Sequence, residues 1–384
     1  MPDPRPIRHA ARRRAAVLTL LLAGLAGLGA TATASAQILV GQTSGFTGPV
    51  AAGVKENTDG ARLVIDAVNA RGGVNGQKIE LVTMDDAFDP KKAAENARVL
   101  ITERNVVALF LNRGTPHTEA IRPLLAQYQV PLVAPSTGAM VLHEPVDPWI
   151  FNVRATYQRE ADKAVRHLAL LGMTRIALVH VDDSFGADGA AGAMTGFAAA
   201  KLQPLMVSKF NRAKPDTAAI MKEAAQKDAQ AVLFFGAAAV VAQGTKELRD
   251  AGSRAQVVTL SNNASGGFIQ QMGVHARGTI VTQVFPNERA VSVPLVREAV
   301  ALAQAKGMTG VTPAMMEGFA AAKVLVEGLR RAGPNPTRAS LAAALGRMER
   351  YDLGGMEMGF GPGDRTGLDY AELSLIDSRG KFVR

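Results

Sequence analysis

The sequence predicts an α/β fold built from two lobes, each with a doubly wound parallel sheet. Short apolar runs alternate with longer stretches of 3.6-residue period, which is typical of βαβ units. The alternation occurs in two successive series of similar length, and 384 residues suit two domains. In such sheets ligands lie beyond the carboxyl ends of the strands, so we expect the loops after strands to form the site.

The first series contains four predicted strands and three predicted helices. Its first helix, Asn57–Ala70, places apolar side chains at the spacing i, i+3, i+4, i+7 and ends before Gly72 and Gly73. In chain order the elements are strand 38–40, helix 57–70, strand 78–84, helix 90–104, strand 106–111, a helix through 121–128 and strand 131–134.

The second series begins at Tyr157 with a helix of the same apolar spacing. Further strands and helices alternate behind it, and a glycine-rich tail ends the chain. In chain order the elements are helix 157–171, strand 176–181, a helix from about 186, strand 205–210, helix 217–227, strands 231–235, 257–260 and 279–284, helices starting near 293, 313 and 337, and strand 371–376.

The first 36 residues have the three parts of an export signal. Several arginines precede the apolar, leucine-rich stretch Ala15–Gly29, and Ala34-Ser-Ala36 follows as a signal-peptidase site. The stretch is shorter than the roughly 20 apolar residues that span a bilayer. We therefore expect cleavage after Ala36 and a periplasmic protein that starts at Gln37 and does not insert into the membrane.

The composition excludes several classes of function. The chain has no cysteine, which excludes disulfides, thiolate nucleophiles and thiolate metal sites. Much of the net charge of +9 lies in the arginine-rich first 36 residues, and no later basic run forms a nucleic-acid footprint. The six histidines are isolated, and neither a nucleophile elbow nor a phosphate loop occurs. We expect no enzymatic activity, no metal, no cofactor and no nucleic-acid partner.

The loop after the first strand, Gly41–Pro49, is rich in glycine but lacks the spacing of a dinucleotide fingerprint. It offers the hydroxyls of Ser44 and Thr47 beside a strand end. An ordinary turn in which Thr47 caps the next helix is an equally good interpretation.

The loop Asn112–Thr118 gives a more specific signal. Thr115 before Pro116 suits a helix N-cap followed by proline, and the N–H groups of such a first turn bind anions. A Thr-Pro pair more often serves the helix alone, but Arg113 beside it favours a carboxylate site. The next strand ends at a further group of candidate residues, Ser136, Thr137 and Gly138.

The second lobe offers two aromatic candidates, Tyr157 and Phe185, which can cover the other side of a small molecule. Asp182 and Asp183 precede a helix that opens near a glycine. We interpret these two residues as helix caps rather than ligand-binding groups.

Together these motifs resemble those of type I periplasmic binding proteins that feed amino acids, especially branched-chain ones, to ABC transporters. The resemblance covers essentially all of the chain after residue 36. It rests on Thr47-Gly-Pro49, Ala70–Leu81, Asp85–Pro90, Gly114-Thr115-Pro116, Val130–Pro135 and Asp183–Gly186.

The resemblance implies two lobes that close on a ligand and are joined by three crossovers. The lobes it implies are residues 37–155 plus 283–360 and residues 156–282 plus 361–384. It further implies that Thr115 binds the ligand α-carboxylate with help from residues 136–138, and that Phe185 closes over the ligand. Where relatives hold the ligand ammonium with an acid, this sequence reads Leu260–Ala264, which contains Asn262 and no carboxylate.

We therefore expect an extracytoplasmic solute-binding protein of an ABC importer, with the permease and its ATPase as partners. The ligand is expected to carry a carboxylate, and an amino acid, an aromatic acid and a dicarboxylic acid all stay open. A ligand-sensing protein of the same fold, detached from a transporter and feeding a signalling partner, is the alternative. The expected binding residues are Ser44, Arg113, Thr115, Ser136, Thr137, Gly138, Tyr157, Phe185 and Asn262.

Overall fold

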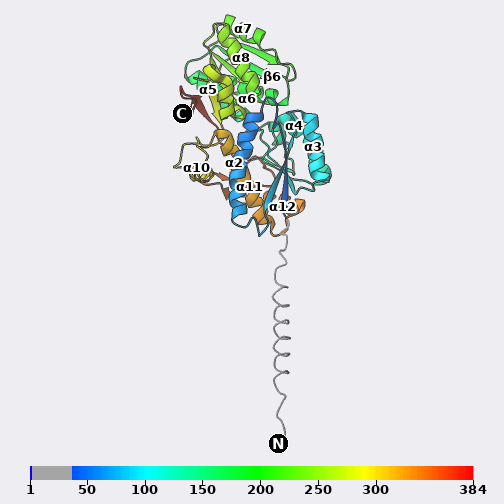
Figure 1. Cartoon of the computed structure of the whole chain (residues 1–384). Coiled ribbons are helices and arrows are strands. Elements are labelled where there is room, and N and C mark those ends of the chain that lie inside the picture. Colours follow the sequence, from blue (N-terminus) through cyan, green and yellow to red (C-terminus); the bar gives the residue numbers. More distant parts are fainter. Residues whose placement is uncertain (2–36, 384) are drawn as a thin grey trace. The chain divides into compact units, whose positions relative to one another are not determined.

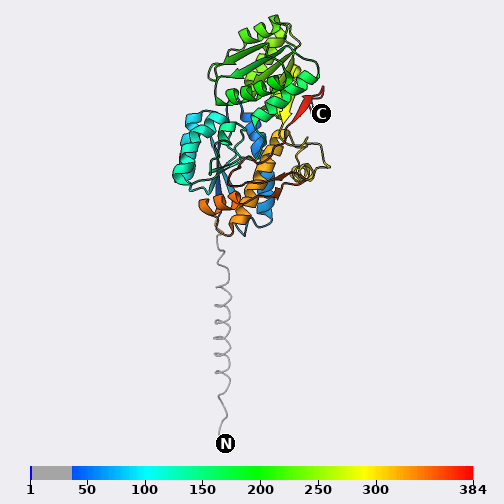
Figure 2. The same cartoon turned by 180° about the vertical axis from the view of Figure 1, so that it is seen from behind.

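The computed structural model describes Met1 and residues 37–383. Apart from Met1, the expected signal peptide lies outside the described residues, so cleavage after Ala36 stays a prediction. Residues 37–383 form one compact unit, which contains two α/β lobes (Figure 1, and from behind in Figure 2).

The first lobe contains a sheet of five parallel strands. Strand β1 runs to Ser44 rather than to the predicted Val40, because it pairs with β2 along its whole length. Ser44 therefore lies in a strand and not in the expected loop. In sheet order the strands are β2 (Ile79–Asp85), β1 (Ile38–Ser44), β3 (Ala108–Phe110), β4 (Leu132–Val133) and β5 (Ile150–Phe151).

Two buried apolar clusters flank this sheet. Helix α2 begins at Ala51, earlier than the predicted Asn57. The prediction missed this start because no side chain among the described residues caps the helix, so no capping residue marks its beginning in the sequence. One cluster is built with α2 (Ala51–Ala70), α10 (Pro294–Ala305), α11 (Pro313–Ala332), α12 (Arg338–Gly346) and the hairpin β11 (Tyr351–Asp352) and β12 (Glu357–Met358), the other with α3 (Pro90–Thr102), α4 (Thr115–Tyr128) and the 3₁₀ turn η1 (Met140–Leu142).

Helices α2 and α11 pack backbone against backbone. A Cβ atom on Gly60 would lie 2.0 Å from the carbonyl oxygen of Met315, and one on Gly318 would lie 1.8 Å from the carbonyl oxygen of Asn57. Neither position has room for a side chain, so only glycine allows this approach.

The second lobe contains a sheet of seven strands. Strands β10, β9, β8, β6 and β7 are parallel, whereas β13 and β14 are antiparallel additions at one edge, in contrast to the purely parallel pattern that the sequence predicts. In sheet order the strands are β14 (Phe382–Val383), β13 (Glu372–Ile376), β10 (Ile280–Gln283), β9 (Gln256–Thr259), β8 (Ala231–Phe235), β6 (Ile176–Val181) and β7 (Met206–Phe210).

Helix α8 and helix α9 of this lobe are absent from the sequence prediction. Helix α8 follows β8 through a continuous apolar run, and no described side chain caps its start, so the strand and the helix merge in the sequence pattern. The helices are α5 (Tyr157–Leu170), α6 (Ser184–Ala200), α7 (Ala218–Gln226), α8 (Ala238–Asp250) and α9 (Gly266–Met272), with the 3₁₀ turns η2 (Ser261–Asn263) and η3 (Gly273–His275).

The chain passes between the lobes three times, from β5 to α5, from β10 to α10 and from β12 to β13. Each lobe has its own buried core, and the core of the second lobe draws mainly on residues 139–281. The predicted fold class, two doubly wound lobes joined by three crossovers, is thereby confirmed. The exact lobe boundaries stay a prediction.

Among the described residues, no helix has both the length and the apolar character that crossing a bilayer requires.

Candidate functional site

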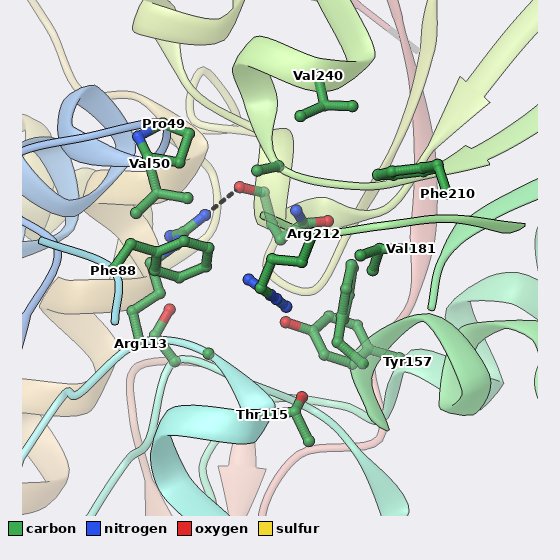
Figure 3. A pocket seen from close by; sticks show the side chains of 15 residues that line it. Pro49, Val50, Phe88, Arg113, Thr115, Tyr157, Val181, Phe210, Arg212 and Val240 are labelled. Carbon is green, nitrogen blue, oxygen red and sulfur yellow. Dashed lines mark hydrogen bonds between the residues drawn. The ribbon is translucent and has the colours of Figure 1, made fainter. Parts of the chain in front are cut away.

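A cavity lies between the two lobes, where the carboxyl ends of β3, β4, β6 and β7 approach one another (Figure 3). Its volume is about 60 Å³. At roughly 10–15 Å³ for each water molecule, this is space for about four to six waters, which suits a ligand of the size of an amino acid or a small acid. The cavity is lined by Pro49, Val50, Phe88, Arg113, Gly114, Thr115 and Ser136 from the first lobe and by Tyr157, Val181, Phe185, Phe210, Arg212, Ala237, Val240 and Asn262 from the second.

Arg113 brings a buried positive charge to the cavity wall. The residue follows β3, is 6% exposed, and donates a hydrogen bond from Nη2 to the backbone carbonyl of Asn262 in the other lobe (Figure 3). Among residues 37–383 it forms no ion pair, and Glu317 and Glu56 act on it only from beyond ion-pair distance. Burial lowers the pKa of the Arg113 guanidinium. Because a carbonyl does not neutralise a cation, this charge is left without a counter-ion.

Helix α4 starts beside Arg113, and its N-cap is Gly114 rather than the predicted Thr115. Gly114 has a φ of 102°, and a Cβ atom there would lie 2.5 Å from Nδ1 of His117, so glycine is required. No side chain of the described residues caps the helix. The amide groups of its first turn therefore lack a side-chain acceptor on the cavity side.

Thr115 is the first residue of α4, and its side chain points toward the cavity (Figure 3). Its Oγ1 lies 2.7 Å from Oγ1 of Thr137, and both residues are buried. Ser136, after β4, also lines the cavity, and its Oγ accepts a hydrogen bond from Nδ2 of Asn57 at 3.1 Å. Three of the expected first-lobe residues, Arg113, Thr115 and Ser136, are thus brought together.

The other three expected first-lobe residues do not line the cavity. The hydroxyl of Thr137 contacts the hydroxyl of Thr115 but does not itself line the cavity. Gly138 lies where two segments meet, since a Cβ atom there would be 2.5 Å from the carbonyl oxygen of Ala155. Ser44 is buried at the end of β1, and within residues 37–383 its Oγ has no hydrogen-bond partner. Ligand contact by these three residues stays a prediction.

Aromatic side chains form much of the apolar wall. The expected Tyr157 and Phe185 contact each other edge to face, with ring centroids 4.9 Å apart and an angle of 74° between the planes. Burial raises the pKa of the Tyr157 phenol, so Tyr157 presents a neutral hydroxyl to the cavity. Phe88 and Phe210 line the cavity as well, and the sequence reasoning missed both, although Phe210 ends a predicted strand.

Arg212, two residues after β7, is the second cation at the cavity and was also missed. Its Nε donates to Oδ2 of Asp183 at 2.5 Å, so this guanidinium has a counter-ion. Its Cζ lies 4.9 Å from the centroid of the Phe88 ring, which belongs to the other lobe. Phe88 in turn stacks on His117 with centroids 4.4 Å apart. The strand end before Arg212 is the signal that could have found this residue.

The two acidic residues before α6, Asp182 and Asp183, both interact with other groups of the protein. Asp183 is the N-cap of α6 and accepts from the amide of Gly186 at 3.0 Å, which confirms the predicted cap. Asp182 pairs with Lys209 at 3.1 Å instead of capping. Thr47 does not cap α2, because its hydroxyl donates to the Asp85 carboxylate at 2.6 Å at the neighbouring strand end.

A buried ionic network holds the loop that contains Asn262. Arg154, on the first crossover, donates to Glu160 and, at 2.7 Å, to Oγ of Ser261. Glu160 also accepts from the Ser261 amide at 2.9 Å, and the Arg154 guanidinium lies 4.5 Å from the Tyr157 ring centroid. Burial opposes the charge of Arg154, but Tyr157 and Glu160 raise its pKa above the ordinary value. The network thereby fixes two cavity walls, Tyr157 and the turn η2.

The polar groups of the cavity are two cations, hydroxyls and an amide. None of the described residues that line it is Asp or Glu. Along the described part of the chain, no group of three His, Asp or Glu side chains is placed to hold a metal ion. The arrangement can bind an anion, and it offers no carboxylate to a ligand ammonium.

Comparison with known proteins shows which family has this architecture. The sequence profile described as "Periplasmic binding protein" matches residues 37–379. The chain belongs to the periplasmic binding protein family. This periplasmic binding protein is 25% identical over 327 residues to a Leu/Ile/Val-binding protein homolog from Brucella melitensis, which covers 83% of the chain and 86% of the relative. The resemblance to type I proteins of the branched-chain amino acid group is thereby confirmed.

Solved structures agree with this assignment. A substrate-binding periplasmic protein from Ralstonia solanacearum is 31% identical, with a TM-score of 0.83 over 90% of this chain and 99% of that one. A solute-binding protein of an ABC transporter from R. palustris, in complex with benzoate, is 16% identical, with a TM-score of 0.79 over 91% of this chain and 95% of that one. The second likeness concerns the fold alone.

Proposed function

We propose that this periplasmic binding protein captures a small carboxylate-bearing solute and delivers it to an ABC importer. The observation that carries the proposal is Arg113, a buried cation that lines the cavity and has no ion-pair partner within residues 37–383. A buried unpaired charge is costly, and a carboxylate in the cavity would supply the missing partner.

The groups around Arg113 suit a carboxylate. The guanidinium offers planar donors, and the uncapped first turn of α4 adds amide donors and the positive end of the helix dipole. The hydroxyls of Thr115 and Ser136 complete the polar end of the cavity. Micromolar binding needs about −8 kcal/mol, which charge-assisted hydrogen bonds and burial between the lobes can supply.

Contacts between the lobes favour a mechanism of closure around the ligand. Arg113 reaches the Asn262 carbonyl across the cavity. Beside the cavity, the Glu56 carboxylate of α2 accepts from the amides of Gly266 and Gly267 of α9 at 3.0 and 2.8 Å. A ligand that touches both lobes stabilises this closed arrangement and shifts the population toward it. The closed surface is then what a membrane permease and its ATPase would recognise.

The family membership supports an extracytoplasmic location and a role in binding rather than catalysis. The relatives reported above are binding proteins, and one belongs to an ABC transporter. The two aliphatic hydroxyls at the described cavity wall, those of Thr115 and Ser136, contact Thr137 and Asn57 and not a general base. We infer that the protein is exported, that its signal peptide is removed after Ala36, and that it has no enzymatic activity.

The experiment that tests the ligand class is calorimetric titration of the chain from residue 37 with pairs of small acids and their primary amides. The acid of at least one pair should bind, and the matching amide should bind at least about 30-fold more weakly, because it lacks the charge that Arg113 needs. Equal binding of acid and amide, or no binding of any acid, would contradict the proposal.

The importer role is tested by uptake of the radiolabelled ligand in cells that lack this gene. Uptake should fall to background and return when the wild-type gene is restored, whereas a signalling role would leave uptake intact. A restored variant that binds no ligand is the control, and uptake in its presence would contradict the importer role.

A further inference from the structure

We propose that the cavity selects aromatic monocarboxylates that carry no ammonium group. This inference rests on the proposed function and narrows it. Three observations carry it: the balance of charges at the wall, the pairing of the adjacent Asp183 carboxylate with Arg212, and the aromatic side chains that line the cavity.

The cations that line the cavity favour a ligand with one negative charge, because only one of them lacks a counter-ion within residues 37–383. Arg212 is already paired with Asp183, whereas Arg113 is not paired with any described residue. A monocarboxylate neutralises Arg113 and leaves the Arg212 pair intact. A second carboxylate on the ligand would have to displace Asp183, which also caps α6, so dicarboxylates are disfavoured.

A ligand ammonium has no partner in this cavity. Asp183 is the carboxylate next to the wall, and it is occupied by Arg212 and by the amide of Gly186. In the turn η2 the side chain of Asn262 stands at the wall, and its Nδ2 donates to the carbonyl of Gly236 at 3.0 Å. An ammonium would instead meet the positive charges of Arg113 and Arg212. The energetic cost of an unpaired, desolvated ammonium therefore works against every α-amino acid.

The apolar wall is suited to an aromatic ring. Four aromatic residues line the cavity, and they come from both lobes: Phe88, Tyr157, Phe185 and Phe210. Phe88 stacks on His117 and Phe210 contacts Phe234 edge to face, with both partners outside the cavity lining, whereas Tyr157 and Phe185 contact each other. A ligand ring among these rings gains edge-to-face or offset contacts, each worth about 2- to 12-fold in affinity beyond burial of the same area. The cavity volume of about 60 Å³ corresponds to about four to six waters, which is enough space for one ring with a carboxylate.

The test is a titration panel on the chain from residue 37, measured by calorimetry and by ligand-induced shifts in melting temperature. The probes are benzoate, cyclohexanecarboxylate, benzamide, terephthalate, L-phenylalanine and L-leucine. We expect benzoate to bind at least about 5-fold tighter than cyclohexanecarboxylate and at least about 100-fold tighter than the two amino acids, benzamide and terephthalate.

Matched variants separate the aromatic contribution from the charge. Phe185→Leu keeps an apolar wall and leaves three aromatic residues at the cavity, so it should reduce the preference for benzoate over cyclohexanecarboxylate and leave the preference for acid over amide. Phe268→Leu is the control, because Phe268 is buried in the same lobe outside the cavity and should change neither preference.

The outcomes distinguish this inference from the proposed function. Tighter binding of leucine or phenylalanine than of benzoate, equal binding of benzoate and cyclohexanecarboxylate, or tighter binding of terephthalate would overturn the inference and leave a carboxylate-binding protein. Failure of every carboxylate to bind would overturn the proposed function as well.

Discussion

Replacing Arg113 with methionine should separate ligand affinity from stability. The substitution removes the guanidinium and keeps an unbranched apolar side chain of similar length. In the ligand-free protein it removes a buried cation that has no ion-pair partner among the described residues. In the complex it removes the group that we propose holds the ligand carboxylate.

The expected magnitudes follow from these contacts. Removing an unpaired buried charge gains about 1–4 kcal/mol, and leaving the Asn262 carbonyl without its donor costs about 1–3 kcal/mol. The two effects oppose each other, and their difference runs from about −2 to about +3 kcal/mol, so the free energy of unfolding should change by no more than about 3 kcal/mol. Loss of a buried, hydrogen-bonded charge from the complex costs about 2–5 kcal/mol, which is a loss of about 30- to 5,000-fold in affinity.

The assay is calorimetric titration with the tightest-binding carboxylate, together with thermal unfolding without ligand. Arg212→Met is the matched control and should lose less affinity, because Asp183 already neutralises that guanidinium. An Arg113→Met protein that binds the carboxylate within about 3-fold of wild type would refute the carboxylate site. One that unfolds several kcal/mol more easily would show that the Arg113 charge is compensated in the ligand-free protein.

Four further predictions concern single side chains. Thr115→Ala should weaken carboxylate binding by about 1–3 kcal/mol with little change in melting temperature, and unchanged calorimetric affinity would contradict its role. Glu56→Gln should weaken binding about 3- to 10-fold although residue 56 does not line the cavity, because the start of α9 loses an anionic acceptor. Solution scattering should show fewer closed molecules, and an unchanged closed fraction would contradict a role of the Glu56 carboxylate in closure. Burial lowers the pKa of His143 to about 4, so at pH 5 the unfolded chain binds a proton that the folded chain does not. His143 should therefore lower the stability between pH 6.5 and about 4, by about 2 kcal/mol at pH 5, and His143→Gln should reduce the measured pH dependence of unfolding. The dependence should not vanish, because burial also lowers the pKa of His117 to about 4; an unchanged pH dependence would contradict the contribution of His143. Asn262→Asp should shift the ratio of benzoate to phenylalanine affinity toward the amino acid by at least about 10-fold, and an unmoved ratio would exclude Asn262 as a determinant of selectivity.

Much of the architecture could be predicted because it depends on local patterns. Buried strands and amphipathic helices have periods that are visible in the sequence, and α5 illustrates this, since it starts at the predicted Tyr157. Helix α8 was missed because its apolar start continues the apolar strand before it. The antiparallel strand β13 was assigned as a strand, but its direction depends on where the chain returns, which periodicity does not encode.

The sequence reasoning located residues that line the cavity where they lie in the loops just after strands, whereas their contact with a ligand stays a prediction. Arg113 and Ser136 lie at the ends of β3 and β4, and parallel topology brings such ends to one edge. Phe88 was missed because it lies in a turn with a φ of 61°, and no pattern marks which turn residue points to the cavity. Arg212 was missed because its role depends on a contact across the two lobes, which neither lobe determines alone.

The glycine contacts between α2 and α11 leave little room for the two helices to move relative to each other. The second lobe reaches the start of α11 through a hydrogen bond from the Ala314 amide to the Ala264 carbonyl, at 2.9 Å. Since the two helices touch through their backbones at Gly60 and Gly318, no side chain can rearrange to absorb a displacement between them. A displacement of the second lobe at Ala314 should therefore be transmitted through α11 to α2, and from there to Pro49 and Val50, which precede α2 and line the cavity.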